Sequence, residues 1–129
     1  MKKQLCFKGL VIAAAAAVTL GTLARPAIAH HSFAMFDRTK ELKLTGQVKD
    51  FQWTNPHTWI QLLVPDAKGG ATEWSIEGAS LNSLVRAGWK RNSVKVGDTV
   101  NVVVNPARDG TKLASLVSVS VNGQIFGNK

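Results

Sequence analysis

Two adjacent histidines, His30 and His31, follow a segment with the features of a secretory signal peptide. If that segment is cut off before His30, the free α-amino group and the imidazole of His30 can close one chelate ring around a metal ion. Deprotonating an amine of pKa about 7.7–8.0 at neutral pH costs only about 1–1.4 kcal/mol, and a bound transition metal supplies many times that. These residues therefore predict a metal site at the processed N-terminus.

The amine and imidazole of His30 are two donors, so the predicted site needs further ligands from elsewhere in the chain. His57 is the first candidate, because it follows a rigid Asn55-Pro56 turn and begins a predicted strand. Amine and imidazole nitrogens suit copper, nickel and zinc, and among divalent ions the intrinsic order favours copper. His31 could ligate instead of His30 or together with it, and the thioether of Met35 would matter for reduced copper. The predicted ligands are His30, His31, His57 and Met35, with a copper ion as the only expected cofactor.

The same histidines also have an inert interpretation. Adjacent histidines at a chain end can simply be solvated, and His57 can cap its turn or stack on Trp59. The sequence has no His-x-x-x-His pair on a predicted helix and no paired cysteines. A metal-free module that binds a small molecule or an envelope protein is therefore the alternative, with a surface formed by Trp53, Trp59, Gln61 and Trp74.

The segment before His30 predicts export. Three lysines precede an apolar run over residues 10–20, and Ala27-Ile28-Ala29 provides the small residues of a cleavage site. The favoured cut follows Ala29, and a weaker cut after Ala24 would leave the nitrogen of His30 in a peptide bond. The run is too short to span a membrane, and the single cysteine, Cys6, precedes it. We therefore predict a periplasmic protein without stable membrane insertion, lipid anchor or disulfide.

Removal of residues 1–29 from the 129-residue chain leaves 100 residues, which is enough for one small domain. The formal charge falls from +8 to +4, since Lys2, Lys3, Lys8 and Arg25 leave with the signal. The remaining basic residues are dispersed, so nucleic-acid binding is not expected. The sequence has no G-x-S-x-G turn, and we interpret Glu73 and Glu77 as solvent-facing strand charges, so we do not expect an enzyme. We also expect the protein to be a monomer.

The order of predicted elements indicates the fold class. An arm over residues 30–40 precedes a domain over residues 41–129. Phe33 and Phe36 of the arm could dock beside Trp59, which would bring the leading histidines near His57. Period-two patterns predict strands over residues 42–53, 57–65, 71–77, 99–105 and 124–126, and a long fifth strand after residue 110 in which Val117, Val119 and Val121 share one face. A glycine and a phase slip in the first strand predict a sharp bend and a bulge near Asp50. A short helix over residues 81–87 lies between the third and fourth strands. That order favours a small, all-β, OB-like barrel of five to six strands over a β-sandwich.

The motifs HHSFAMFD (residues 30–37) and FQWTNPH (residues 51–57) carry a resemblance. With WSIEG, GW and NPARDG further along, the chain resembles a family of small exported bacterial proteins known only as a domain of unknown function. It is more broadly similar to periplasmic OB-fold proteins. The resemblance implies export and an OB-like fold, and it implies no reaction.

Overall fold

The computed structural model describes residues 33–129. The predicted signal peptide, its predicted cleavage site, His30 and His31 lie outside this range. Within it, no helix has both the length and the apolar character needed to cross a membrane. The elements are a 3-10 turn η1 (Phe33–Met35), strands β1 (Leu42–Gln52), β2 (Trp59–Pro65) and β3 (Ala71–Glu77), helix α1 (Leu81–Arg86), and strands β4 (Thr99–Pro106), β5 (Leu113–Val121) and β6 (Gln124–Gly127).

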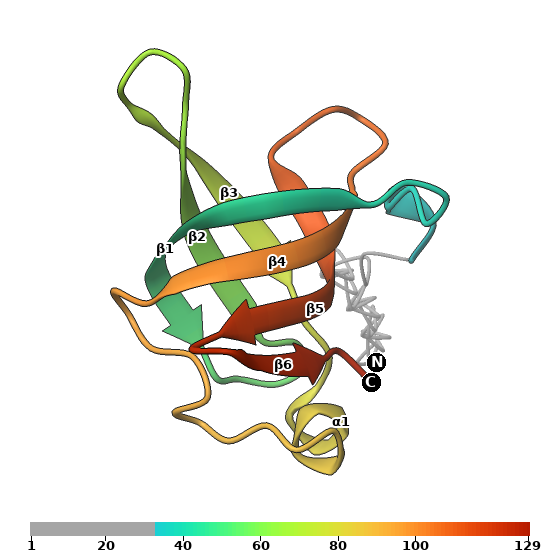
Figure 1. Cartoon of the computed structure of the whole chain (residues 1–129). Helices are drawn as coiled ribbons and strands as arrows, with labels where there is room; N and C mark the ends of the chain where they lie inside the picture. Colours follow the sequence, from blue (N-terminus) through green and yellow to red (C-terminus); the bar gives the residue numbers. More distant parts are fainter. Residues whose placement is uncertain (1–32) are drawn as a thin grey trace, which may run out of the picture. The chain divides into compact units, whose positions relative to one another are not determined.

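The strands close into a barrel, which confirms the predicted OB-like fold (Figure 1). Neighbours follow the order β3-β2-β1-β4-β5-β6, and all of these pairs are antiparallel. A parallel pairing of β3 with β5, with Ile76 opposite Ala114, joins the two ends of the five-stranded part. This closure rules out the β-sandwich, and β6 continues the sheet outside the barrel.

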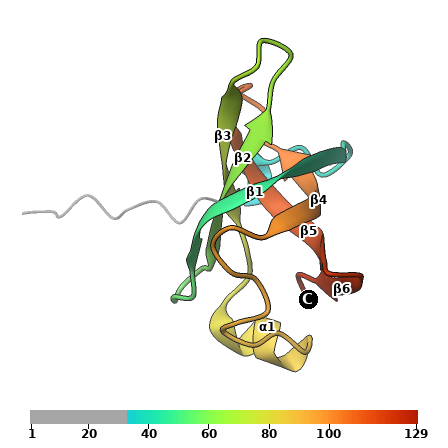
Figure 2. The ribbon, with the colours of Figure 1, turned by 60° about the vertical axis from the view of Figure 1, so that its left-hand side comes forward.

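The barrel interior is filled by side chains at alternate strand positions, as period-two patterning requires. Helix α1 lies across one end, between β3 and β4 (Figures 1 and 2). Its Leu84, together with Trp89 and Val94 of the following loop, is fully or almost fully buried and seals that end. The strands contribute buried Val48, Ile60, Leu62, Trp74, Ile76, Val100, Val102, Val104, Ala114, Leu116, Val119 and Val121.

Strand β1 bends so that it can pair with β2 at one end and β4 at the other. The register with β2 shifts between Val48 and Asp50, where the sequence predicted a bulge. Gly46 is required by close approach, because a Cβ there would overlap the backbone carbonyl of Leu63. The glycine and the bulge together let one long strand serve both halves of the barrel.

Strand β5 departs from the predicted alternation. Val117 was expected to share a face with Val119, but Leu116 and Val119 are buried and Val117 is only half-buried. The register against β4 shifts at this point, with Val103 opposite Ser118 and Val104 opposite Leu116. The extra residue in β5 turns its inward face by one position, which a period of two cannot anticipate.

The described part of the arm docks on the loop between β4 and β5 instead of beside Trp59. Phe36 is 3% exposed and forms an isolated bridge with Ala107. The amide of Arg108 donates to the carbonyl of Met35 (2.9 Å), and its Nε donates to that of Ala34 (3.1 Å). These contacts anchor the root of the arm at the β4–β5 loop.

Asp37 strengthens this anchor. Its amide donates to the carbonyl of Pro106 over 2.8 Å. Hydrogen bonds from the side chain and amide of Thr39, together with the nearby charges of Arg108 and Lys40, lower the pKa of the Asp37 carboxyl from its ordinary value. The contacts at the arm root therefore stabilise the ionised form of the Asp37 carboxyl group.

Candidate functional site

The start of β2 and the end of β3 meet at one end of the barrel. Trp59 lies opposite Glu77 in the antiparallel register. The pairing continues beyond β2, since the amide of Thr58 donates to Ala79 (3.1 Å) and that of Gly78 donates to Thr58 (2.8 Å). His57 and Glu77 therefore lie on neighbouring segments, close enough for their side chains to touch.

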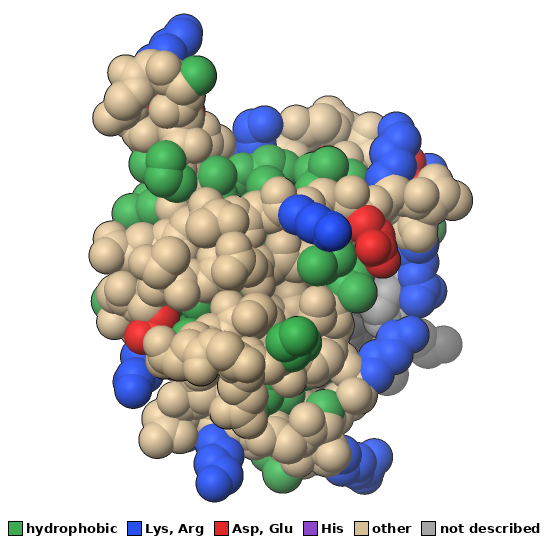
Figure 3. Space-filling model, in the orientation of Figure 1, with side chains coloured by type: hydrophobic (Ala, Val, Ile, Leu, Met, Phe, Trp, Pro, Cys, Tyr) green, Lys and Arg blue, Asp and Glu red, His purple; other side chains and the backbone are tan. Residues whose placement is uncertain are grey.

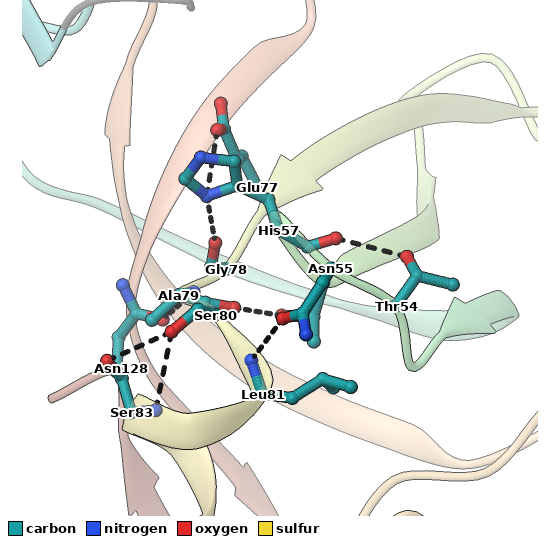
Figure 4. Close-up of polar contacts among 11 residues, drawn as sticks. Thr54, Asn55, His57, Glu77, Gly78, Ala79, Ser80, Leu81, Ser83 and Asn128 are labelled. Atoms are coloured by element: carbon teal, nitrogen blue, oxygen red, sulfur yellow. Dashed lines mark hydrogen bonds and ion pairs between the residues drawn. The ribbon is translucent and has the colours of Figure 1, made fainter.

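His57 contacts two acceptors through one ring nitrogen (Figure 4). Its Nδ1 lies 3.1 Å from the carbonyl oxygen of Gly78 and 3.2 Å from Oε1 of Glu77. Because the carbonyl of Gly78 can only accept, this contact is a hydrogen bond when Nδ1 carries the proton. No residue within 33–129 is hydrogen bonded to Nε2, and the side chain is 35% exposed. In the neutral ring, the lone pair of Nε2 is thus available to a ligand.

Glu77 is buried, which corrects the prediction of a solvent-facing charge. Its side chain is 8% exposed, and Oε2 is buried with no hydrogen-bond partner in the described part of the chain. The physical reason is its position at the end of β3, where Trp59 of β2 flanks it on one side and Ser115 of β5 on the other. Glu73, earlier in the same strand, is exposed and pairs with Lys49 over 2.7 Å.

Several side chains hold the two segments around this pair in place (Figure 4). Oδ1 of Asn55 accepts from the amide of Leu81 at the start of α1 (3.1 Å). Oδ1 of Asn128 accepts from the amide of Ala79 (2.7 Å), which ties the end of the chain to the segment after β3. The Thr54 hydroxyl donates to the carbonyl of His57 (3.1 Å). His57 is therefore presented by a loop with many hydrogen bonds, which a ligand-binding residue needs.

A groove of about 400 Å³ lies between the arm root and the end of the chain, and neither His57 nor Glu77 lines it. Phe36 and Arg38 line it at the arm root. Ser115 and Asn128 line it toward the cluster, where Ser115 pairs with Glu77 and Asn128 bonds to Ala79. The groove therefore runs beside the segments that pair with Glu77 and bond to Ala79.

Of the predicted metal ligands, the structure describes His57 and Met35. Met35 lies at the β4–β5 loop, where its carbonyl accepts from the amide of Arg108, and no hydrogen bond in the described part of the chain joins it to His57 or Glu77. Among residues 33–129, no group of three or more His, Cys, Asp or Glu side chains is placed to hold a metal ion. A metal centre at His57 therefore needs ligands from the preceding residues, and His30 and His31 are the candidates.

The chain matches over residues 17–116 a family described as a family of unknown function, DUF6152. The matched range includes His30, His31, His57 and Glu77. This chain belongs to the DUF6152 family. Comparison with curated proteins and with solved structures finds no match.

The aromatic residues predicted to bind a ligand in this DUF6152 protein do not share one exposed surface. Trp74 is buried in the core at 8% exposure, and Nζ of Lys112 lies 5.0 Å from the centre of its ring. Trp53 packs against the core beside Phe51. Trp59 and Gln61 are half-buried at outward positions of β2, where Oε1 of Gln61 accepts from the Ser75 hydroxyl.

Charge is spread over the surface of the barrel. Figure 3 shows Lys and Arg side chains around the margin of one face, with no single patch that gathers them. A dispersed arrangement of this kind lacks the continuous basic groove that follows a nucleic-acid backbone. The site with the most specific chemistry in the DUF6152 barrel is therefore the pair formed by His57 and Glu77.

Proposed function

We propose that this protein binds a transition-metal ion, copper(II) in the first instance, and carries or buffers it in the periplasm without turning over a substrate. The ligands are the α-amine and imidazole of a processed His30, the imidazole of His57, and His31 as a further nitrogen donor. The observation that carries the proposal is the orientation of His57. Its Nδ1 faces two acceptors and its Nε2 has no partner within residues 33–129.

Chain length is compatible with this assembly. Along the sheet, Ile76 pairs with Ala114 and Ala114 pairs with Pro106, to which Asp37 is hydrogen bonded. Two strand spacings of about 4.8 Å make roughly 10 Å between β3 and β4. Three residues, from Phe33 back to His30, span at most about 11 Å when extended. The arm root is therefore anchored about two strand spacings from β3, and the proposal requires the residues before Phe33 to cover the remaining distance to His57.

The donor set selects the kind of ion. An amine and imidazoles are nitrogen donors, which suit copper(II), nickel(II) and zinc(II), with copper(II) favoured in intrinsic affinity. The thioether of Met35, the soft donor that would favour reduced copper, belongs to a residue whose backbone is hydrogen bonded to Arg108 of the β4–β5 loop. We therefore expect the oxidised, divalent ion to be the cargo.

A titration of the processed form, residues 30–129, tests the function. Copper(II) is added in competition with a chromophoric chelator, and tryptophan fluorescence is followed in parallel. We expect one equivalent to bind and to quench fluorescence, because Trp59 neighbours the proposed site in the chain and copper(II) is paramagnetic. Absence of copper binding by this form would reject the proposal and favour a metal-free binding module.

A further inference from the structure

Glu77 presents a physical problem that the barrel itself does not solve. Its carboxyl group is more than nine-tenths buried, and Oε2 has no hydrogen-bond partner in the described part of the chain. Burial of a carboxylate is costly unless a positive group or several donors compensate. An apolar side chain of similar size would fill the same volume without this cost.

The contacts of Glu77 point to the reason for its presence. The side chain has one polar partner within residues 33–129, Nδ1 of His57, at 3.2 Å from Oε1. The carbonyl of Gly78 already offers Nδ1 an acceptor at 3.1 Å. An ionised Glu77 therefore adds negative charge beside the ring, next to the hydrogen bond between Nδ1 and the Gly78 carbonyl. A neutral imidazole alone leaves that charge uncompensated.

We propose that Glu77 is the positioning residue of a carboxylate–imidazole–metal relay in which His57 is the middle member. The carboxylate holds the proton on Nδ1, so that Nε2 faces outward toward the ion. A divalent cation on Nε2 then supplies, through the ring, the positive charge that the buried carboxylate lacks. This inference rests on the proposed metal-binding function and adds to it the residue that tunes the ligand.

General coordination chemistry supports the arrangement. Histidines that ligate metals commonly donate their other ring N–H to a carboxylate or a carbonyl, which fixes the tautomer and makes the ligating nitrogen more basic. A hydrogen bond to an ionised acceptor is also stronger than one to a neutral acceptor. Because Glu77 lies on the Nδ1 side of the ring, an ion on Nε2 cannot contact it directly. Glu77 therefore acts through His57.

Two substitutions separate the charge of Glu77 from its shape. Glu77→Gln keeps an acceptor oxygen and removes the negative charge, whereas Glu77→Leu removes both. Loss of such a partner typically lowers metal affinity by 10- to 100-fold, so we expect about 10-fold for Glu77→Gln and nearer 100-fold for Glu77→Leu in copper(II) competition titrations. Glu73→Gln is the matched control, because it removes an exposed carboxylate of the same strand, and its affinity should equal that of the wild type.

A second readout does not depend on metal. Nitrogen-15 NMR of the imidazole in the metal-free protein, at a pH well above the ordinary imidazole value of about 6.5, reports which ring nitrogen of His57 carries the proton. We expect the Nδ1–H form in the wild type and in Glu77→Gln, and a larger share of Nε2–H in Glu77→Leu. Circular dichroism checks that each variant is folded, and Glu77→Gln keeps the test valid if Glu77→Leu does not fold.

The two proposals fail in different ways. Copper affinities of the Glu77 variants equal to that of a copper-binding wild type would overturn the positioning role and leave the proposed function intact. An Nε2–H tautomer in the wild type would also overturn it. A wild type that binds no copper but shows the Nδ1–H form, with the tautomer altered in Glu77→Leu, would reject the metal function. In that case Glu77 orients His57 without a metal, and the relay is overturned.

Discussion

Acetylation of the α-amine of His30 in the processed protein is expected to weaken copper(II) binding about 100-fold. A four-ligand metal site in a small protein releases roughly 10–16 kcal/mol, which is about 3 kcal/mol for each ligand and corresponds to roughly 100-fold in affinity. An acetylated nitrogen has no lone pair to donate, and the chelate ring formed by the amine and the imidazole of His30 is lost with it. Competition titration with a chromophoric chelator measures the change.

The modification can be made selective. The reference pKa of an α-amine, about 7.7–8.0, lies well below that of lysine at about 10.4, so acylation near neutral pH favours the chain end. Thermal unfolding of the metal-free protein, monitored by circular dichroism, should be unchanged because residues 33–129 keep all their contacts. Equal copper affinity before and after acetylation would show that the amine is not a ligand.

Substitution of His57 by Asn is expected to lower copper(II) affinity by a similar factor, about 100-fold, for the loss of one ligand. The amide nitrogen of Asn can take the place of Nδ1 and donate to the Gly78 carbonyl, whereas nothing replaces Nε2. The variant thus removes the ligand and preserves the local hydrogen bond. Competition titration of the processed protein measures its affinity beside the wild type.

The reference for this variant is a short peptide that begins at His30 and ends at Phe36. An N-terminal amine beside two imidazoles binds copper by itself, so the His57→Asn protein should fall to the affinity of that peptide. If the wild type, the variant and the peptide all bind equally, the barrel contributes no ligand. His57 would then be a structural residue of its turn.

Much of the fold could be predicted from local patterns. Strand β3 occupies the predicted residues, and helix α1 begins at the predicted Leu81 after its Ser80 cap. The glycine and the phase slip in β1 correctly indicated a bend and a bulge near Asp50, and the register shift lies between Val48 and Asp50. These features are set by residues close together in the chain, so the sequence displays them directly.

The candidate site could be predicted only in part, because its key contact joins residues 20 positions apart. His57 was found from its residue type and its place after a turn. Glu77 was assigned to the solvent, since alternation with Trp74 and Ile76 puts it on the outer face of β3. Glu77 is buried because β2 pairs with β3 on one side and β5 pairs with it on the other. A period-two pattern within one strand does not show which other strands will pair with it.

The location of the arm could not be predicted for a related reason. Phe36 was expected beside Trp59 and is instead buried beside Ala107. Apolar residues in an arm indicate that it docks, but they carry no information on where, because the hydrophobic effect is non-directional. The backbone hydrogen bonds of Met35 to Arg108 and of Asp37 to Pro106, at the end of β4 and the start of the following loop, determine the place.

One measurement tests the central claim, that a single ion joins the processed chain end to His57. A small fraction of an equivalent of copper(II) is added to the isotopically labelled protein, and the imidazole NMR signals are recorded, since a paramagnetic ion broadens the signals of nuclei near it. Our account predicts that the signals of His30 and His57 disappear together, at the same copper concentration. Loss of the His30 signal with an unchanged His57 signal would contradict it.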